Sequence, residues 1–143
     1  MDTVEARLRD RGFEIPAPAP SLASYAPALQ VGNLVYISGQ LPMRDGKLAF
    51  EGVVEWNLGV GDAKKAAELC LLNILGQLKA HLGSLEGVRC VRLGGFVQSK
   101  SSFREHASVL NGACDLLVYA LGDRGKHARA SVWCSSLPLN AAV

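Results

Sequence analysis

The stretch Val88–Gln98, VRCVRLGGFVQ, decides the class of fold, because it is a strand pattern that stands between two helix patterns. Its β-branched and apolar residues alternate with arginines, which is typical of a half-buried strand. The glycine pair Gly94–Gly95 inside it predicts a bulge. We therefore expect helices and strands to alternate through the C-terminal half of the chain.

Upstream of this strand, the pattern predicts a helix that begins at Asp62, its expected N-cap, and ends at Leu82. Its length would be about 30 Å at 1.5 Å per residue. The apolar positions recur with helical spacing and share one face. These positions are Ala67, Cys70, Leu71, Ile74, Leu75, Leu78 and Leu82.

Downstream, a second helix is predicted to start at a capping box formed by Ser102 and Glu105, and to stop at Gly122. A further strand, ARASVWC, is expected over Ala128–Cys134. The apolar face of this second helix consists of Phe103, Ala107, Leu110, Cys114, Leu117 and Leu121.

The N-terminal half carries a short helix pattern over Thr3–Arg11, followed by an extended connector, PAPAP, at Pro16–Pro20. Ser24–Leu41 is rich in β-forming residues on both sides of a turn signal at Gly32–Asn33, which predicts a hairpin. A third strand is expected at Leu48–Val54.

The predicted order is β-β-β-α-β-α-β, an α+β fold with a mixed sheet. Both long helices should pack on one face of the sheet, because each has one apolar stripe to bury. The other face then lacks a cover. It either meets another copy of the chain in a closed symmetric oligomer or is solvated.

Composition narrows the classes of function. Fifteen Lys and Arg against thirteen Asp and Glu leave a net charge of +2 without a basic run, which argues against nucleic-acid binding. The four cysteines stand far apart, with no clustered histidines, so we expect buried reduced thiols, no metal site and no cofactor. Neither a signal peptide nor a membrane helix is indicated, which predicts a cytosolic protein.

Three stretches together resemble the YjgF-like family, also called reactive intermediate deaminases or Rid proteins. They are YAPALQVGNLVYISGQL at Tyr25–Leu41, GFVQSKSSFRE at Gly95–Glu105, and RASVWCSSLP at Arg129–Pro138. The likeness spans residues 21–143, leaving residues 1–20 as an N-terminal helix and proline-rich connector. It implies a chorismate-mutase-like fold assembled as a homotrimeric barrel, with sheets inside, helices outside and clefts between subunits.

The resemblance also implies hydrolysis of enamines and imines, such as 2-aminoacrylate, to 2-keto acids and ammonia. Arg129 matches the family's arginine and would bind the substrate carboxylate through paired N–H groups. Tyr25 matches the pocket tyrosine, and Ser38 and Gly39 match the segment that borders the cleft. Ser131 stands where characterised deaminases often have cysteine. The family's usual glutamate, thought to position the attacking water, would lie beyond Val143.

Other interpretations stay open at this stage. A chain without that glutamate would be a weak deaminase or a non-catalytic protein that binds small carboxylates. A ribonuclease role, attached to some relatives, is poorly supported by the charge balance. Apart from the resemblance, Arg129 and Tyr25 would be ordinary strand residues and Ser38–Gly39 a turn. We expect all three histidines, which are His81, His106 and His127, at the surface.

Overall fold

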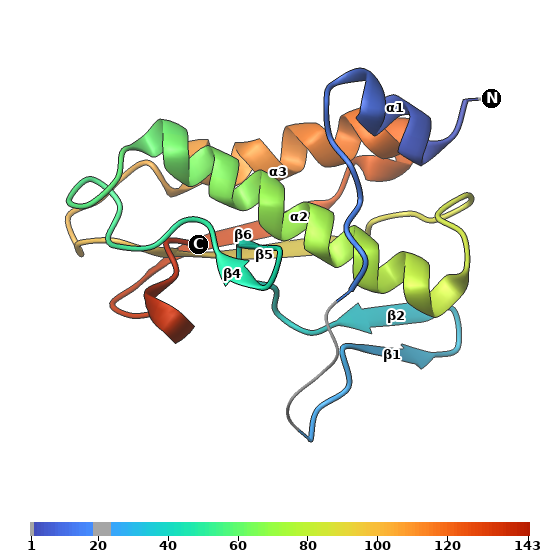
Figure 1. Ribbon diagram of the computed structural model, residues 1–143, viewed down its shortest axis with the longest axis horizontal. Helices are drawn as coiled ribbons and strands as arrows, with labels where there is room; N and C mark the ends of the chain where they lie inside the picture. The colour runs from blue at the N-terminus through green and yellow to red at the C-terminus, as the bar shows by residue number, and fades with distance from the viewer. Residues whose placement is uncertain (1, 19–23) are drawn as a thin grey trace.

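The computed structural model describes residues 2–18 and 24–143, and two long helices cover the strands. Helix α2 spans Val60–Leu82 and helix α3 spans His106–Leu121, and they run side by side in one layer (Figure 1). Helix α1, Val4–Asp10, packs against α3. The buried apolar residues lie between these helices and the strands beneath them.

Strands β5 (Arg92–Gln98) and β6 (Ala128–Cys134) form a parallel pair joined through α3. Strand β6 has the predicted bounds, whereas β5 starts four residues later than expected. The predicted bulge at Gly94–Gly95 is wrong, because every residue of β5 faces one partner on β6. Gly95 instead allows α3 to approach closely, since a Cβ there would lie 2.6 Å from Leu110 Cδ1.

The predicted hairpin is confirmed. Strands β1 (Ala28–Val31) and β2 (Leu34–Ile37) pair antiparallel around a turn in which Gly32 has φ +59°. Val35 and Ile37 are half-buried, while the residues of the opposite face are exposed, and the hairpin contacts α2.

The third predicted strand, Leu48–Val54, is wrong. The chain instead forms a two-residue hairpin of β3 (Met43–Arg44) and β4 (Lys47–Leu48), because positive φ angles at Asp45 and Gly46 turn it back. Residues 50–52 then pair with the C-terminal segment: Ala142 N–H donates to Phe50 O at 3.2 Å, and Gly52 N–H donates to Asn140 O at 2.8 Å. This stretch therefore makes isolated bridges, antiparallel from Glu51 to Ala141 and parallel from Val54 to Ser99, instead of a continuous strand.

The α+β class is confirmed, with both antiparallel and parallel pairs. Among the described residues the strands form three separate two-stranded sheets, β1–β2, β3–β4 and β5–β6, rather than one continuous sheet.

Helix α2 begins at Val60 after the N-cap Gly59, so the prediction of Asp62 as the cap is wrong. It ends at Leu82, as predicted, with Gly83 in the left-handed conformation at φ +81°. The expectation of a single apolar stripe is also wrong, because α3 and the N-terminal segment both pack on α2. The buried residues outside the predicted stripe are Ala66, Leu69, Leu72 and Gly76.

Helix α3 begins at His106 rather than after a capping box. Its N-cap is Glu105, which makes no side-chain capping bond, so the predicted Ser102–Glu105 box is wrong. A turn closed by Phe103 N–H donating to Lys100 O at 3.0 Å occupies this segment, and it allows the Phe103 ring to be buried.

Helix α1 matches its prediction closely. The Thr3 hydroxyl oxygen accepts a hydrogen bond from Ala6 N–H at 3.1 Å, and Val4 and Leu8 are fully buried. Of the predicted connector, residues 16–18 are neither helix nor strand, and residues 19–20 lie outside the described residues.

No helix within residues 2–18 and 24–143 has the length and apolar character that crossing a membrane requires. The cytosolic location stays a prediction.

Candidate functional site

Arg129 lies on β6 with an exposed side chain that contacts α3. Its Nη1 donates to Asn111 Oδ1 at 2.7 Å and to Cys114 Sγ at 3.5 Å. Both hydrogens of Nη1 are therefore engaged. The Nε–H and Nη2 groups have no partner among the described residues, and together they form the side of the guanidinium that binds a carboxylate with two parallel hydrogen bonds.

His127, two residues earlier on the chain, completes the surroundings of the same thiol. Its Nδ1 lies 2.6 Å from Gly125 O, and its Nε2 lies 3.1 Å from Cys114 Sγ. A carbonyl oxygen can only accept, so Nδ1 carries a proton. In the neutral ring, Nε2 is then the acceptor, and the Cys114 S–H donates to it.

We refer to Asn111, Cys114, His127 and Arg129 as the thiol cluster. Asn111 and Cys114 are one turn apart on α3. His127, directly before β6, has the same parity as Arg129 on β6, and hydrogen bonds join the two pairs. This cluster was not predicted from the sequence, because Cys114 was expected in the core and His127 at the surface. The signal available was the spacing of the two pairs, together with the expectation that the second helix packs on the last strand.

The four cysteines have different environments, and no disulfide joins them. Burial raises the pKa of Cys70 to about 12. Burial also raises the pKa values of Cys90 and Cys134, and the nearby Cys114 adds to the effect on Cys90. The prediction of buried thiols is confirmed for Cys70 and Cys114, while Cys90 and Cys134 are only half-buried.

Ser131 lies on β6 two residues after Arg129, on the side that faces α3. Its hydroxyl donates to His106 O at 3.0 Å, so it ties the strand to the first turn of the helix. The His106 ring meets the Phe103 ring edge-on at 5.0 Å, and its Nε2 is buried without a partner among the described residues. The prediction that all histidines lie at the surface holds for His81 and is wrong for His106 and His127, which are half-buried.

The remaining predicted site residues lie at the base of the β1–β2 hairpin. The Ser38 hydroxyl donates to Ala26 O at 2.6 Å and its N–H donates to Pro27 O at 3.0 Å, which closes the hairpin. Tyr25 is 60% exposed, and Gly39 is exposed. This hairpin contacts α2, whereas Arg129 contacts α3. One chain therefore brings Arg129 and Ser131 together, but gives no hydrogen bond that links Ser38 to Arg129.

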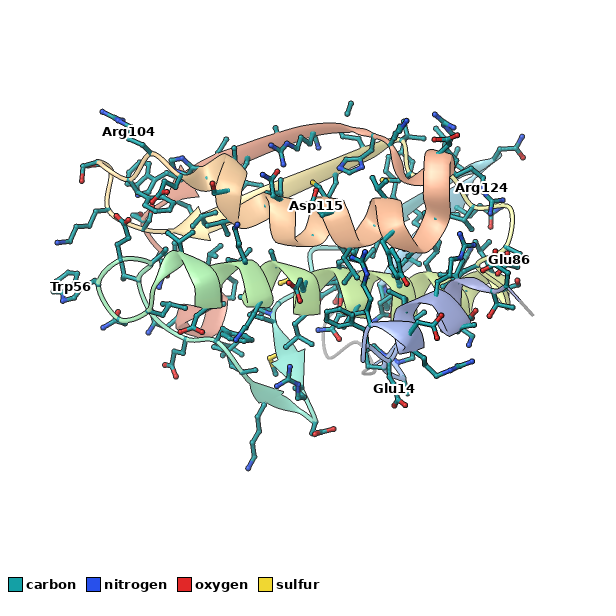
Figure 2. The ribbon with its side chains drawn as sticks, turned by 90° about the horizontal axis from the view of Figure 1, so that it is seen from above. Glu14, Trp56, Glu86, Arg104, Asp115 and Arg124 are labelled. Carbon is teal, nitrogen blue, oxygen red and sulfur yellow. The ribbon has the colours of Figure 1, made fainter. Side chains whose placement is uncertain are left out.

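Figure 2 shows α2 and α3 side by side, with Trp56 and Arg104 near one end of the pair and Glu86 and Arg124 near the other. A hollow of about 190 Å³ includes Asn111 together with Lys64 and Glu68, but Arg129 does not line it. Within the described residues, no group of three or more His, Cys, Asp and Glu side chains could hold a metal ion.

These features define a small α+β domain in which a strand bearing an exposed arginine packs beside a helix. The chain belongs to the family described as "YjgF/chorismate mutase-like, putative endoribonuclease", whose model matches residues 5–143. It is 38% identical over 142 residues to Protein TCP17 of Trypanosoma cruzi, which covers 98% of this chain and 89% of that protein.

Solved structures agree with this family. The protein Atu1372 from Agrobacterium tumefaciens, of unknown function, has a TM-score of 0.92 and 47% identity, covering 97% of this chain and 86% of that one. RidA from the Antarctic bacterium Psychrobacter sp. PAMC 21119 has a TM-score of 0.57 and 32% identity, covering 88% and 86%. The overlap with RidA is thus the looser of the two.

Proposed function

We propose that the chain is an enamine/imine deaminase that hydrolyses small 2-imino acids of the 2-aminoacrylate type to 2-keto acids and ammonia. The observation that carries the proposal is the exposed Nε–Nη2 side of Arg129, held in place by the hydrogen bonds of Nη1 to Asn111 and Cys114. Membership of the YjgF-like family supports it.

Hydrolysis of the imine requires little more than a correctly positioned substrate and water. The imine carbon next to the carboxylate is electrophilic, water adds to it, and the C–N bond breaks to give the ketone and ammonia. Arg129 would fix the carboxylate with two parallel hydrogen bonds, and a guanidinium remains charged at any working pH. Because Asn111 and Cys114 already orient the guanidinium, less freedom is lost when the substrate binds.

We also propose that a homotrimer completes the site, with Tyr25, Ser38 and Gly39 of one chain facing Arg129 of its neighbour. Support comes from an exposed apolar face on the hairpin, whose residues Leu29, Val31, Leu34 and Tyr36 are 48% to 62% exposed. Phe96 on β5 and Val132 on β6 are also exposed, at 57% and 45%. Exposed apolar patches of this kind are typical of an interface.

The test is the hydrolysis of freshly generated 2-aminoacrylate, followed through 2-keto acid and ammonia. Arg129→Ala should lower kcat/KM by about a hundredfold, the loss expected when a bidentate carboxylate contact is removed. Arg129→Lys should recover only part of the rate. The matched control is Arg92→Ala, which removes another exposed arginine from the neighbouring strand and should leave the rate unchanged. Equal rates in Arg129→Ala and the wild type would refute the role of Arg129.

A second candidate function is binding of small carboxylates without turnover. The side-chain partners of Arg129 within the described part of the chain are an amide and a thiol rather than a carboxylate that could activate water. Pyruvate that raises the Tm, together with no ammonia from the imine, would favour this function over the first. The Tm with pyruvate and the release of ammonia are measured on the same preparation, so together they distinguish a deaminase from a carboxylate-binding protein.

A further inference from the structure

Cys114 has a different set of neighbours from the other three cysteines. An imidazole nitrogen lies 3.1 Å from its sulfur and a guanidinium nitrogen lies 3.5 Å from it. The imidazole can take the thiol proton, and the guanidinium then faces the sulfur anion with a fixed positive charge. These are the surroundings in which cysteines act as nucleophiles.

We propose that Cys114 is a reactive thiol, which hydroperoxides oxidise to a sulfenic acid with the help of His127 and Arg129. The ligand class is a small hydroperoxide, with hydrogen peroxide as the simplest example.

The proposed step balances. The thiol proton passes to His127 Nε2, and the sulfur attacks one peroxide oxygen. A bond from sulfur to oxygen forms and the O–O bond breaks. The leaving hydroxide takes the proton from the His127 imidazolium and departs as water. The sulfur is oxidised by two electrons and the peroxide is reduced by two. Gly125 O holds Nδ1–H at 2.6 Å throughout, so Nε2 stays directed at the sulfur.

The other cysteines provide an internal comparison, because the more accessible thiol and the thiol with activating neighbours are different residues. Cys134 is half-buried and therefore more accessible than Cys114, but the hydrogen-bond partner of its sulfur among the described residues is a carbonyl, Val97 O at 3.6 Å. The sulfur of Cys70 likewise contacts Val143 O at 3.7 Å. If accessibility governed oxidation, Cys134 would react first. If the neighbours of the sulfur govern it, Cys114 reacts first.

The proposal does not depend on the deaminase activity. It concerns the side of Arg129 that faces α3, through Nη1, whereas carboxylate binding uses Nε and Nη2. Peroxide could oxidise Cys114 in a chain that hydrolyses no imine. Conversely, a competent deaminase could have an unreactive Cys114.

The experiment treats the folded protein with hydrogen peroxide in the presence of dimedone, which traps sulfenic acids, and locates the adduct by peptide mass spectrometry. We expect Cys114 to be labelled at least tenfold faster than Cys134. Cys114→Ser should remove the rapidly formed dimedone adduct, and Cys134→Ser should leave the rate of Cys114 labelling unchanged. His127→Gln, which keeps a polar side chain without the base, should slow labelling at least tenfold.

Arg129→Met provides a second variant should His127→Gln fail to fold, since it removes the cation and its hydrogen bonds to Asn111 and Cys114 while the position itself is exposed. It should slow labelling severalfold, with circular dichroism confirming the native fold. Preferential labelling of Cys134 or Cys90 would overturn the proposal. So would an unchanged rate of Cys114 labelling in both His127→Gln and Arg129→Met.

Discussion

The β5–α3–β6 unit and the β1–β2 hairpin differ in where a single chain buries their apolar side chains. In the first, Leu93, Gly95 and Val97 of β5 are buried on the helix side, and polar side chains such as Ser131 tie β6 to α3. In the second, Val35 and Ile37 face α2, while the other face exposes a run of large apolar side chains. The helix side of the β5–α3–β6 unit is thus buried within one chain, whereas the outer face of the hairpin stays exposed, as do Phe96 and Val132 on the far side of β5–β6.

This contrast separates two kinds of stabilisation. Substitutions in the helix layer should change the free energy of unfolding of a single chain. Substitutions on the outer hairpin face should change association and leave the fold of the chain intact, because those side chains are 48% to 62% exposed in a single chain.

The largest effect is expected at Gly112, where α3 crosses α2. A Cβ at this position would lie 2.4 Å from Lys64 O, which is backbone and cannot move aside. Gly112→Val should lower the free energy of unfolding by about 1–3 kcal/mol, the usual cost of overpacking. Urea unfolding followed by circular dichroism measures it.

Gly61→Ala is the matched control, since Gly61 is also helical and a Cβ there would meet no atom within 4 Å. It should raise the free energy of unfolding by about 0.5–1 kcal/mol through the lower backbone entropy of alanine. Equal effects of the two substitutions would contradict the close crossing of α2 and α3.

A smaller effect, confined to association, is expected on the hairpin. Tyr36→Asp places a charge on the outer face, where Tyr36 is 59% exposed in a single chain. If a neighbour covers this face, the substitution should weaken assembly at least tenfold, since burying a large side chain is worth about 1.5–3 kcal/mol. Sedimentation velocity measures the loss of trimer, and the monomer should keep its helical circular dichroism.

The adjacent residue provides the control for this prediction. Val35 faces α2 from the same strand and is half-buried. Val35→Asp should therefore destabilise the chain itself as well as its assembly. A wild-type protein that sediments as a monomer at micromolar concentrations would refute the proposed trimer.

The sequence predicted those elements whose signals are local. The hairpin around Gly32, the end of α2 at Gly83 and the strand Ala128–Cys134 each depend on a few neighbouring residues, and each is found. The prediction of a strand at Leu48–Val54 was wrong because its apolar pattern is equally compatible with isolated bridges to distant segments, and periodicity alone does not distinguish these cases.

Other parts depend on contacts that no local pattern reports. Helix α2 buries two sides because of neighbours that are remote in sequence, so a single-stripe reading underestimated its burial. Arg129 and Ser131 were predicted from resemblance, but Cys114 and His127 meet only when α3 lies on β6. Their contact depends on the register of a helix against a strand, which two separate periodicities do not fix.

The smallest effect concerns the attachment of α1 to the helix layer, through the ion pair of Glu5 with Lys79 at 3.0 Å. Burial alone would raise the pKa of Glu5, but the hydrogen bond from Lys79 and nearby positive charges lower it below the ordinary 4.5. A folded-state pKa below the unfolded one contributes stability at neutral pH, and that contribution is lost as the pH falls below 4.5. Glu5→Gln should therefore lower the free energy of unfolding at pH 7 by about 0.2–1 kcal/mol, as for exposed pairs.

Glu68, on the same helix layer, has a pKa shift of the opposite sign and serves as the control. Burial raises its pKa, and the charge of Lys65 offsets this only in part. The folded chain then holds this proton more tightly than the unfolded chain, so the ionised Glu68 lowers stability at neutral pH, and the penalty disappears as the pH falls through the raised pKa. Glu68→Gln should thus raise the free energy of unfolding slightly at pH 7, while Glu5→Gln lowers it, and each difference from the wild type should shrink as the pH falls from 7 through the folded-state pKa of the carboxyl concerned. Thermal unfolding of the three proteins across this pH range tests the pair, and two differences of the same sign at pH 7 would contradict the assigned environments.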